Sequence, residues 1–212
     1  IAQCLVGSEM CIRDRHMANK IITISREFGS GGRFIGEEVA KKLGMKYYDK
    51  DIISQIAEKL GFSKEYISQN AELSPKKGLF AYALTGRDTT GKSVEDMVYE
   101  AQRKVILEIA ENDSCVIIGR NADYILKDRT DVINIFIHAD MPEKVKRICR
   151  LYNVTETEAV AMTADIDKRR MTNYRYYTDQ KWGMARNYTL TLNSSQLGYD
   201  MCEKIIMECA QQ

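Results

Sequence analysis

A glycine-rich stretch near the start of the chain carries the clearest sign of chemistry. Residues 25–36 read SREFGSGGRFIG and separate a short apolar run from a segment with helical character. Gly29, Gly31 and Gly32 permit a close turn, so that successive main-chain N–H groups can point at one anion. The dipole of the following helix would strengthen that attraction. The stretch indicates a phosphate-binding loop, and a plain glycine-rich turn between strand and helix is the alternative.

The positive charge of this loop is unusual, because the stretch does not satisfy the pattern G-x-x-x-x-G-K-[ST] and contains no lysine. The nearest cations are Arg26 and Arg33. A guanidinium can bind two phosphate oxygens at once, so a relocated arginine can substitute for the usual ammonium. We expect Arg33, which opens the helix beside the glycines, to contact bound phosphate. A solvated arginine of the first helical turn is the alternative.

Further polar residues follow other apolar runs. Arg120 comes directly after the run 115–118, and ligand sites of open α/β sheets gather at the carboxyl ends of strands. We therefore expect Arg120 to lie near the glycine loop and to bind an anionic group. Asp49 follows a weaker run at 46–48. It could orient a substrate or a metal-bound water, or it could cap the helix expected from Asp51.

The pattern of apolar residues predicts the elements that position these groups. The runs Ile21–Ile24, Cys115–Ile118 and Val132–Ile137 are rich in Ile and Val, as is typical of strands buried on both faces of a parallel sheet. Weaker strand candidates are Lys46–Tyr48 and Tyr188–Leu192. Helices are expected at 33–43, 51–60, 93–111, 142–152 and 198–209, with one more starting at 155. Strands alternating with helices predict an α/β fold.

Local signals support the helix boundaries. Gly44 fits a C-cap, Pro142 fits a first helical turn, and Thr155 with Glu158 forms a capping box. Residues 62–92 and 163–187 fall outside the alternation. The second window has six basic and three acidic side chains, a charge of about +3, and no apolar face. From the residues alone, it reads as a basic helix end balanced by Asp165 and Asp167.

The composition suits one globular domain over residues 17–212, with 44% hydrophobic residues, 29% charged residues and a formal net charge of +1. This charge gives no overall attraction to nucleic acid or to an anionic membrane. The six cysteines include no C-x-x-C pair, which favours reduced thiols in a cytoplasmic protein. Residues 1–16 are interpreted as a non-native or disordered leader.

Four segments together resemble a known family. ITISREFGSGGRFIGEEVAKKL (22–43) resembles the start of the cytidylate kinase-like proteins, a divergent branch of the P-loop nucleoside monophosphate kinases. In this pairing Gly32 stands in the place of the loop lysine and Phe34 in that of the Mg-binding hydroxyl residue. YYDKDII (47–53) resembles the acceptor-side element in which Asp49 matches an aspartate. CVIIGRNADYIL (115–126) resembles the element whose arginine, here Arg120, meets the acceptor nucleotide; Asn121 replaces an aspartate. Residues 163–187 resemble the arginine-bearing lid.

The resemblance spans nearly all of residues 20–210 and implies a three-layer P-loop kinase fold. This fold has a parallel five-stranded sheet, a helical insert at 62–92 on the acceptor side and an Arg-rich lid at 163–187. It implies phosphoryl transfer from ATP, with Mg²⁺, to a nucleoside monophosphate that resembles cytidylate. Magnesium would rest mainly on ATP oxygens and water, with Ser30 the one loop hydroxyl able to approach it.

The resemblance also implies roles for particular residues. The nucleotide-binding residues are Arg26, Gly29, Ser30, Gly31, Gly32, Arg33 and Phe34. Asp49, Arg120 and Asn121 would bind the acceptor. The catalytic candidates are Arg33, Arg169, Arg170 and Asp167, and the two lid arginines would complete the site when the lid closes.

Two other classes of function stay open. A non-catalytic nucleotide-binding or regulatory domain could keep the glycine loop without its lysine. Interleaved Arg and Tyr residues at 163–187 could stack bases, but the small net charge and the lack of an aromatic RNA-binding sheet motif disfavour nucleic-acid binding. His138 is the one histidine of residues 17–212, which leaves imidazole-based nucleophilic catalysis without a basis. We expect small-molecule nucleotides as partners, and neither nucleic acid nor membrane.

Overall fold

The structure of the protein, a computed structural model, describes residues 20–49, 55 and 94–211. The leader expected at 1–16, the insert expected at 62–92 and nearly all of the helix expected at 51–60 lie outside the described residues. None of the described helices is both long and apolar enough to cross a membrane.

Five strands of the described residues form one parallel sheet, which confirms the predicted fold class. They are β1 (Ile21–Arg26), β2 (Lys46–Tyr48), β3 (Cys115–Ile118), β4 (Val132–His138) and β5 (Leu190–Asn193), in the order β2-β3-β1-β4-β5. β1 is the central strand and pairs with both β3 and β4. β5 begins later than the predicted run, because Tyr188 N still closes a turn onto Ala185 O.

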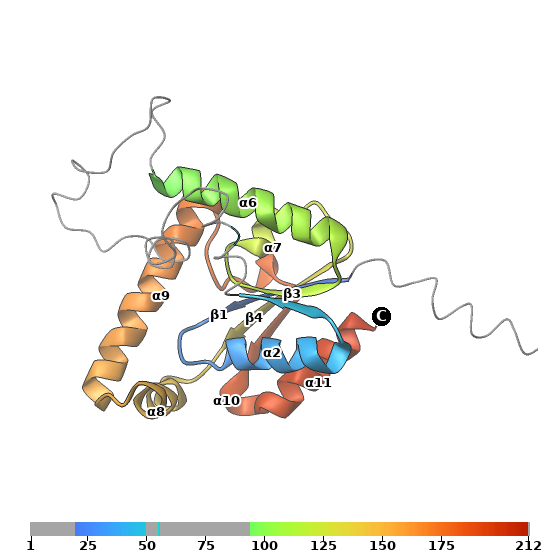
Figure 1. Cartoon of the computed structure of the whole chain (residues 1–212). Helices are drawn as coiled ribbons and strands as arrows, with labels where there is room; N and C mark the ends of the chain where they lie inside the picture. The colour runs from blue at the N-terminus through green and yellow to red at the C-terminus, as the bar shows by residue number, and fades with distance from the viewer. Residues whose placement is uncertain (1–19, 50–54, 56–93, 212) are drawn as a thin grey trace, which may run out of the picture.

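Helices cover both faces of this sheet. Among the described residues they are α2 (Gly32–Leu43), α6 (Val94–Asn112), α7 (Ala122–Ile125), α8 (Met141–Tyr152), α9 (Glu156–Thr178), α10 (Ser194–Leu197) and α11 (Tyr199–Ala210), with a 3₁₀ turn η1 (Ala185–Asn187). Figure 1 shows three layers, with α6 and α7 over one face of the sheet and α2 and α11 over the other. α9 rises from the end of α8 along the edge where the β1–α2 loop turns (Figure 1).

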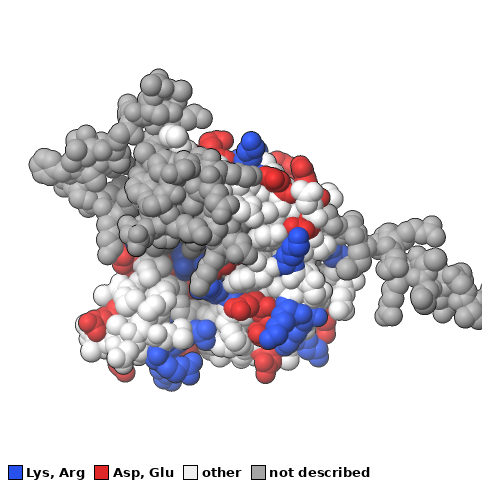
Figure 2. All heavy atoms as spheres, in the orientation of Figure 1, with Lys and Arg blue, Asp and Glu red and all other residues white. Residues whose placement is uncertain are grey.

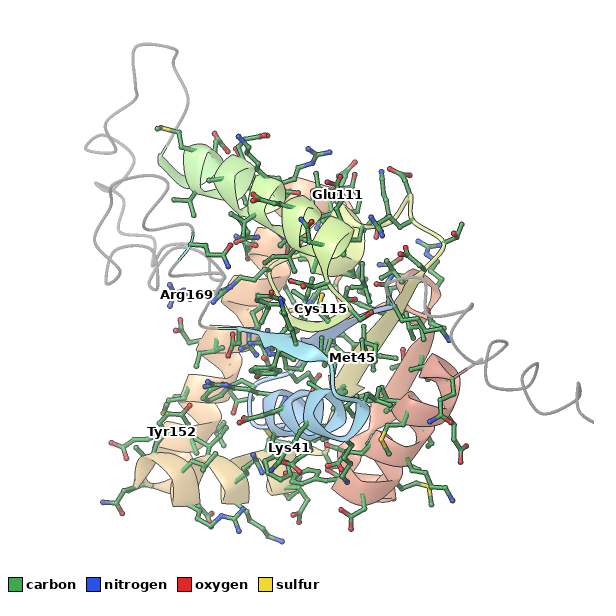
Figure 3. The ribbon with its side chains drawn as sticks, turned by 45° about the vertical axis from the view of Figure 1, so that its right-hand side comes forward. Lys41, Met45, Glu111, Cys115, Tyr152 and Arg169 are labelled. Carbon is green, nitrogen blue, oxygen red and sulfur yellow. The ribbon has the colours of Figure 1, made fainter. Side chains whose placement is uncertain are left out.

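Alternate residues of the strands fill two cores. Ile21, Cys115 and Ile117 pack beneath α6 and α7, and Figure 3 labels Cys115 in this layer. Ile24 and Ile118 point the other way and pack against α2 and α11. Complete burial of one such side chain is worth about 1.5–3 kcal/mol. Because both faces of β1 are buried, the loop that follows this strand starts from a fixed position.

The helix boundaries follow the predicted signals. Gly44 has a φ of 65° and ends α2, and Pro142 lies in the first turn of α8. The capping box that starts α9 is present in full. Glu158 N donates to Thr155 Oγ1 at 3.3 Å, and Thr155 N donates to Glu158 Oε2 at 2.8 Å.

Residues 163–178 belong to α9, a single helix of 23 residues, although the window 163–187 has no apolar face. The reason is chemical. Ala159 and Met162, near the start of α9, pack on apolar residues of α8, but the part of α9 within this window turns polar and aromatic side chains to the rest of the protein. These side chains hold the helix through hydrogen bonds, ion pairs and ring stacking. A search for apolar periodicity does not detect such a face.

A substitution at Gly36 can show how tightly α2 packs on the sheet. A Cβ atom at this position would lie 2.5 Å from Ile118 Cδ1 and 3.0 Å from Ile24 Cδ1. Alanine favours a helix over glycine by about 1 kcal/mol, but added volume in a filled core costs about 1–3 kcal/mol. We therefore predict that Gly36→Ala lowers the free energy of unfolding, measured by urea denaturation, by about 1 kcal/mol.

The matched experiment repeats this substitution in an Ile118→Val background, which lacks the Cδ1 atom. The loss caused by Gly36→Ala should become smaller there, because the two sites are coupled through one contact. Equal losses in both backgrounds would show that crowding against Ile118 is not the cause.

Candidate functional site

The loop between β1 and α2 (residues 27–31) lies close against its neighbours. Gly29 and Gly31 have φ angles of 82° and 80°, in the left-handed region that favours glycine. A Cβ atom at Gly31 would lie 2.7 Å from the Tyr199 ring, and one at Gly32 would lie 2.6 Å from Arg26 Cβ. These glycines are therefore required both for the turn and for the close approach of the main chain.

Ser30 shapes this loop from within. Its buried Oγ donates a hydrogen bond to Glu27 O at 2.9 Å and accepts one from Gly32 N at 3.4 Å. Ser194 Oγ donates to Ser30 O at 2.7 Å, which ties the loop to the start of α10. In this structure the Ser30 hydroxyl thus stabilises the turn.

A cavity of about 340 Å³ opens on one side of the loop. It is lined by Gly29, Ser30, Ala139, Glu143, Lys146, Arg147, Arg150, Ser194, Ser195, Gly198 and Tyr199. Three of these side chains are cations of α8, and Arg147 Nη1 donates to Tyr199 Oη at 2.7 Å. The glycine loop therefore borders a basic cavity of the size that small ligands occupy in proteins, about 300–1,000 Å³.

A second cavity lies at the carboxyl ends of β1 and β3 and is much smaller, about 20 Å³. It is lined by Ser25, Arg26, Gly119, Arg120, Asn121, Arg170 and Trp182. Arg26, Arg120 and Arg170 come from three separate parts of the sequence, and the structure brings them together here as the sequence analysis expects for Arg120. Arg120 is only 4% exposed, so its charge faces the interior of the site.

The backbone that presents Arg120 has an unusual conformation. Gly119, Arg120 and Asn121 have φ angles of 68°, 63° and 54°, three successive residues in the left-handed region. Non-glycine residues adopt this region at a cost, and such strain gathers at functional sites. Gln102 Nε2 donates to Arg120 O at 2.6 Å, and Asn121 Nδ2 donates to Asn173 Oδ1 at 3.1 Å. These bonds from α6 and to α9 hold the turn in place.

Asp49, directly after β2, lies between two of the predicted arginines. Arg33 Nε is 2.9 Å from Asp49 Oδ2, and Arg120 Nη2 is 3.9 Å from Asp49 Oδ1. Burial would lower the pKa of Arg33, but the Asp49 carboxylate, Tyr47 and Glu37 together outweigh burial and the pKa is raised. Arg33 thus points toward the end of β2 with 52% of its side chain exposed, and its predicted contact with donor phosphates stays a prediction. Phe34 packs on the Tyr199 ring, with centroids 5.7 Å apart.

One face of α9 crosses the carboxyl edge of the sheet. Phe28 N donates to Asp167 Oδ1 at 2.7 Å, and Arg170 Nη1 donates to Arg26 O at 3.0 Å. One and two turns further on, Tyr174 Oη donates to Asp123 Oδ2 at 2.7 Å and the Tyr177 ring stacks on Tyr99. The spacing of three and four residues places all four side chains of α9 on one face. This face brings the predicted Asp167 and Arg170 to the glycine loop.

Arg169 lies apart from these contacts. Its Nη1 is 4.0 Å from Asp165 Oδ2 on the same helix, and Figure 3 shows it midway along α9. Figure 2 shows basic and acidic side chains mixed over the described part of one face of the molecule. Two of the three acidic groups in the window 163–187, Asp165 and Asp167, lie close to Arg169 and Arg170 on the same helix.

Comparison with known proteins decides the family. The model of the cytidylate kinase-like family matches residues 21–196. The chain belongs to the cytidylate kinase-like family. Cytidylate kinase of Archaeoglobus fulgidus is 25% identical to it over 195 residues, which cover 90% of this chain and 94% of that protein.

Solved structures confirm the fold of this cytidylate kinase-like chain. An uncharacterized protein from Eubacterium ventriosum is 25% identical, with a TM-score of 0.70 and coverage of 91% of this chain and 99% of that one. Shikimate kinase from Bacteroides thetaiotaomicron is 15% identical, with a TM-score of 0.52 and the same coverage. At that identity the likeness concerns the fold alone, which is that of the P-loop kinases.

Two charged residues of this cytidylate kinase-like site, Lys144 and Glu27, were not among the candidates from the sequence. Lys144 of α8 is 4% exposed, and its Nζ lies 3.0 Å from Glu27 Oε2 and 3.1 Å from Asp167 Oδ2. Burial raises the pKa of Asp167 and outweighs the opposing hydrogen bond from Phe28 N and the Lys144 charge. A signal existed in the sequence, because Lys144 precedes Ile148 by four residues and therefore lies on the buried face of α8.

A third unforeseen residue is Asp123 in the first turn of α7. It is fully buried, and burial raises its pKa to about 6 despite the hydrogen bond from Tyr174 and one of 3.5 Å from Ser25 Oγ. The carboxyl group joins α9 to the end of β1. Because its pKa is about 6, this carboxyl group of the cytidylate kinase-like site loses its proton as pH rises through this value.

We predict that Asp123→Asn changes how stability depends on pH. A carboxyl group whose pKa is about 6 in the folded protein and 3.8 in the reference state binds a proton more readily when folded. Its contribution to stability is therefore fully present at low pH and is lost as pH rises from about 4 to 6. Across this window, the free energy of unfolding of the wild type should fall by about 3 kcal/mol relative to that of Asp123→Asn.

Urea denaturation of both proteins at several pH values measures this difference. Asp113→Asn is a matched control, because that carboxylate is bonded to Lys46 and Tyr48 and its pKa is lowered instead. Both the folded and the unfolded pKa of Asp113 lie below pH 4, so its variant should give nearly parallel curves between pH 4 and 6, with any small difference of the opposite sign. Parallel curves for the wild type and Asp123→Asn between pH 4 and 6 would contradict the assignment.

Proposed function

We propose that the protein is an ATP-dependent kinase that transfers a phosphoryl group to a nucleoside monophosphate, with a cytidylate-like acceptor. The family and the kinase fold support nucleotide kinase activity. The observation that carries the proposal is a pair of cavities supplied with cations, one bordered by the glycine loop and the other by Arg26 at the end of β1 and Arg120 after β3. Phosphoryl transfer needs two phosphates held in line and their charge neutralised, and little else from the protein.

In this proposal the larger cavity takes the donor nucleotide. The main-chain N–H groups of the loop would bind its phosphates, and Lys146, Arg147 and Arg150 would add positive charge from α8. The helix dipole of α2 points at the same place. Transfer would then proceed toward the small cavity beside the loop.

The cations that line the small cavity would neutralise the negative charge of the phosphoryl group during its transfer. Arg26, Arg120 and Arg170 line it together, and guanidinium groups placed where charge develops favour the transition state. Asp49 and Asn121 would position the acceptor beside Arg120, and Asp49 also holds Arg33. Arg169, which lies near Asp165 on the same helix, would act on closure of the lid.

Magnesium enters with ATP in this class of reaction. The described residues contain no group of three or more His, Cys, Asp or Glu side chains able to hold a metal ion, and the Ser30 hydroxyl is engaged within the loop. Within the part of the chain that the structure describes, these residues do not form a protein site for the ion. Mg²⁺ would be held by phosphate oxygens and water, and the roles given above to protein residues do not depend on it.

A non-catalytic nucleotide-binding domain is the second candidate. It is favoured by the loop itself, which has no lysine and whose Phe28 N–H already binds Asp167. Such a domain would bind ATP without transferring its phosphoryl group.

An acceptor panel separates the two candidates. We predict that the purified protein forms ADP from ATP only when a nucleoside monophosphate is added, and that CMP gives the highest rate among CMP, dCMP, UMP, AMP and GMP. A coupled ADP assay measures this. If no acceptor yields product while ATP still raises the melting temperature, the regulatory function is the correct one.

Arg120 gives a sharper test of the acceptor side. We predict that Arg120→Gln lowers kcat/KM for the acceptor by about tenfold or more, because a charge-assisted hydrogen bond to phosphate is worth about 1.5–3 kcal/mol. ATP affinity, measured by calorimetry, should change little. Arg129→Gln is the control, since Arg129 pairs with Asp131 away from both cavities. An Arg120 variant that keeps full kcat/KM, or that loses ATP affinity to the same extent, would refute the role.

A further inference from the structure

The Asp167 carboxylate lies on the glycine loop in the manner of a bound anion. Its Oδ1 accepts a hydrogen bond from Phe28 N at 2.7 Å and lies 3.6 Å from Arg170 Nη1. Its Oδ2 lies 3.1 Å from Lys144 Nζ. One main-chain N–H of the loop and two cations therefore converge on one carboxylate.

Lys144 is placed at this point by α8. A Cβ atom built on Gly29 would lie 3.1 Å from both the Cβ and the carbonyl oxygen of Lys144, so α8 runs in contact with the loop. The Lys144 side chain is buried and its ammonium contacts two carboxylates, those of Glu27 and Asp167. An ammonium thus lies beside the glycine loop, although it comes from a helix more than a hundred residues later in the chain.

The donor set suits a phosphate group as well as a carboxylate. Ammonium, guanidinium and loop N–H groups form charge-assisted hydrogen bonds with the oxygens of either anion. A phosphate group brings more negative charge and more acceptor oxygens to the same donors. Glu27 stays beside Lys144 when Asp167 leaves, so that the ammonium keeps one carboxylate partner.

We propose that Lys144 supplies to the donor phosphates the ammonium that the glycine loop lacks, and that the Asp167 carboxylate occupies this site until a phosphate group displaces it. The proposal rests on the proposed function and deepens it. Asp167 is then an internal competitor of ATP, and its release from Phe28 N couples phosphate binding to the position of α9.

The test measures binding of ATP and of tripolyphosphate, which has no base, by calorimetry on the full chain. Asp167→Asn keeps a side-chain oxygen for the Phe28 N–H but removes the competing charge. It should tighten binding of both ligands by about fivefold or more. Asp165→Asn is the matched control, because it removes the same charge from α9 at a residue that pairs with Arg169. It should change affinity by less than about twofold.

A second variant tests the lysine. Lys144→Met in a Glu27→Gln background avoids leaving Glu27 as an unpaired charge, and it should weaken binding of both ligands about tenfold or more relative to Glu27→Gln alone. Lys204→Met, which removes an exposed ammonium paired with Glu208 on α11, is the control. Thermal unfolding of each variant shows whether it is folded.

The outcomes separate this inference from the kinase function. Unchanged or weaker binding by Asp167→Asn would overturn the inference, even if the wild type forms product with an acceptor. Tighter binding by Asp167→Asn together with weaker binding by the lysine variant supports it, even if the wild type forms no product. If neither the wild type nor Asp167→Asn binds either ligand, both proposals fail.

Discussion

The contact of the Asp167 carboxylate with Phe28 N and Lys144 joins the three parts from which the site is built: the glycine loop, α8 and α9. Apart from Ala159 and Met162, which pack on α8, α9 is held to the rest of the protein mainly by polar and aromatic contacts, among them this one and the bond from Tyr174 to Asp123. Buried charges are stable only when they are paired, and removal of one partner costs about 3–5 kcal/mol. Glu27, Lys144, Asp167 and Arg170 therefore form one unit whose members are stable only together.

The cores of the sheet provide the rigid frame for this unit. β1 is buried on both faces and ends in the loop, while β3 ends in the left-handed turn that presents Arg120. Because β1 and β3 are neighbours in register, their carboxyl ends place the loop and Arg120 side by side. The apolar residues thus fix the relative positions of the two cavities, and the polar residues that line each cavity determine its charge.

The apolar pattern was sufficient to predict the parallel sheet, and cap residues such as Thr155 and Glu158 were sufficient for helix ends, because both depend on neighbours close in sequence. The positions of the glycines and of Arg120 at the carboxyl ends of β1 and β3 could be predicted as well, since each follows directly on a strand. Lys144 and Asp123 were missed because their roles depend on partners brought from other elements. Arg33 shows the same limit: its place beside the glycines was predicted, but its ion pair with Asp49 arises only from the packing of α2 against β2.

The central position of β1 has a consequence for how the protein folds during synthesis. β1 is the first strand of the sequence, yet its partners begin at Cys115 and Val132, and contacts of such long sequence separation slow folding. During synthesis, β1 and the glycine loop stay without their lateral strands until the residues from Cys115 to His138 have been made. Tyr199, against which Gly31 packs, is translated later still. A ribosome-bound chain would therefore complete the packing of its glycine loop only after Tyr199 has been made.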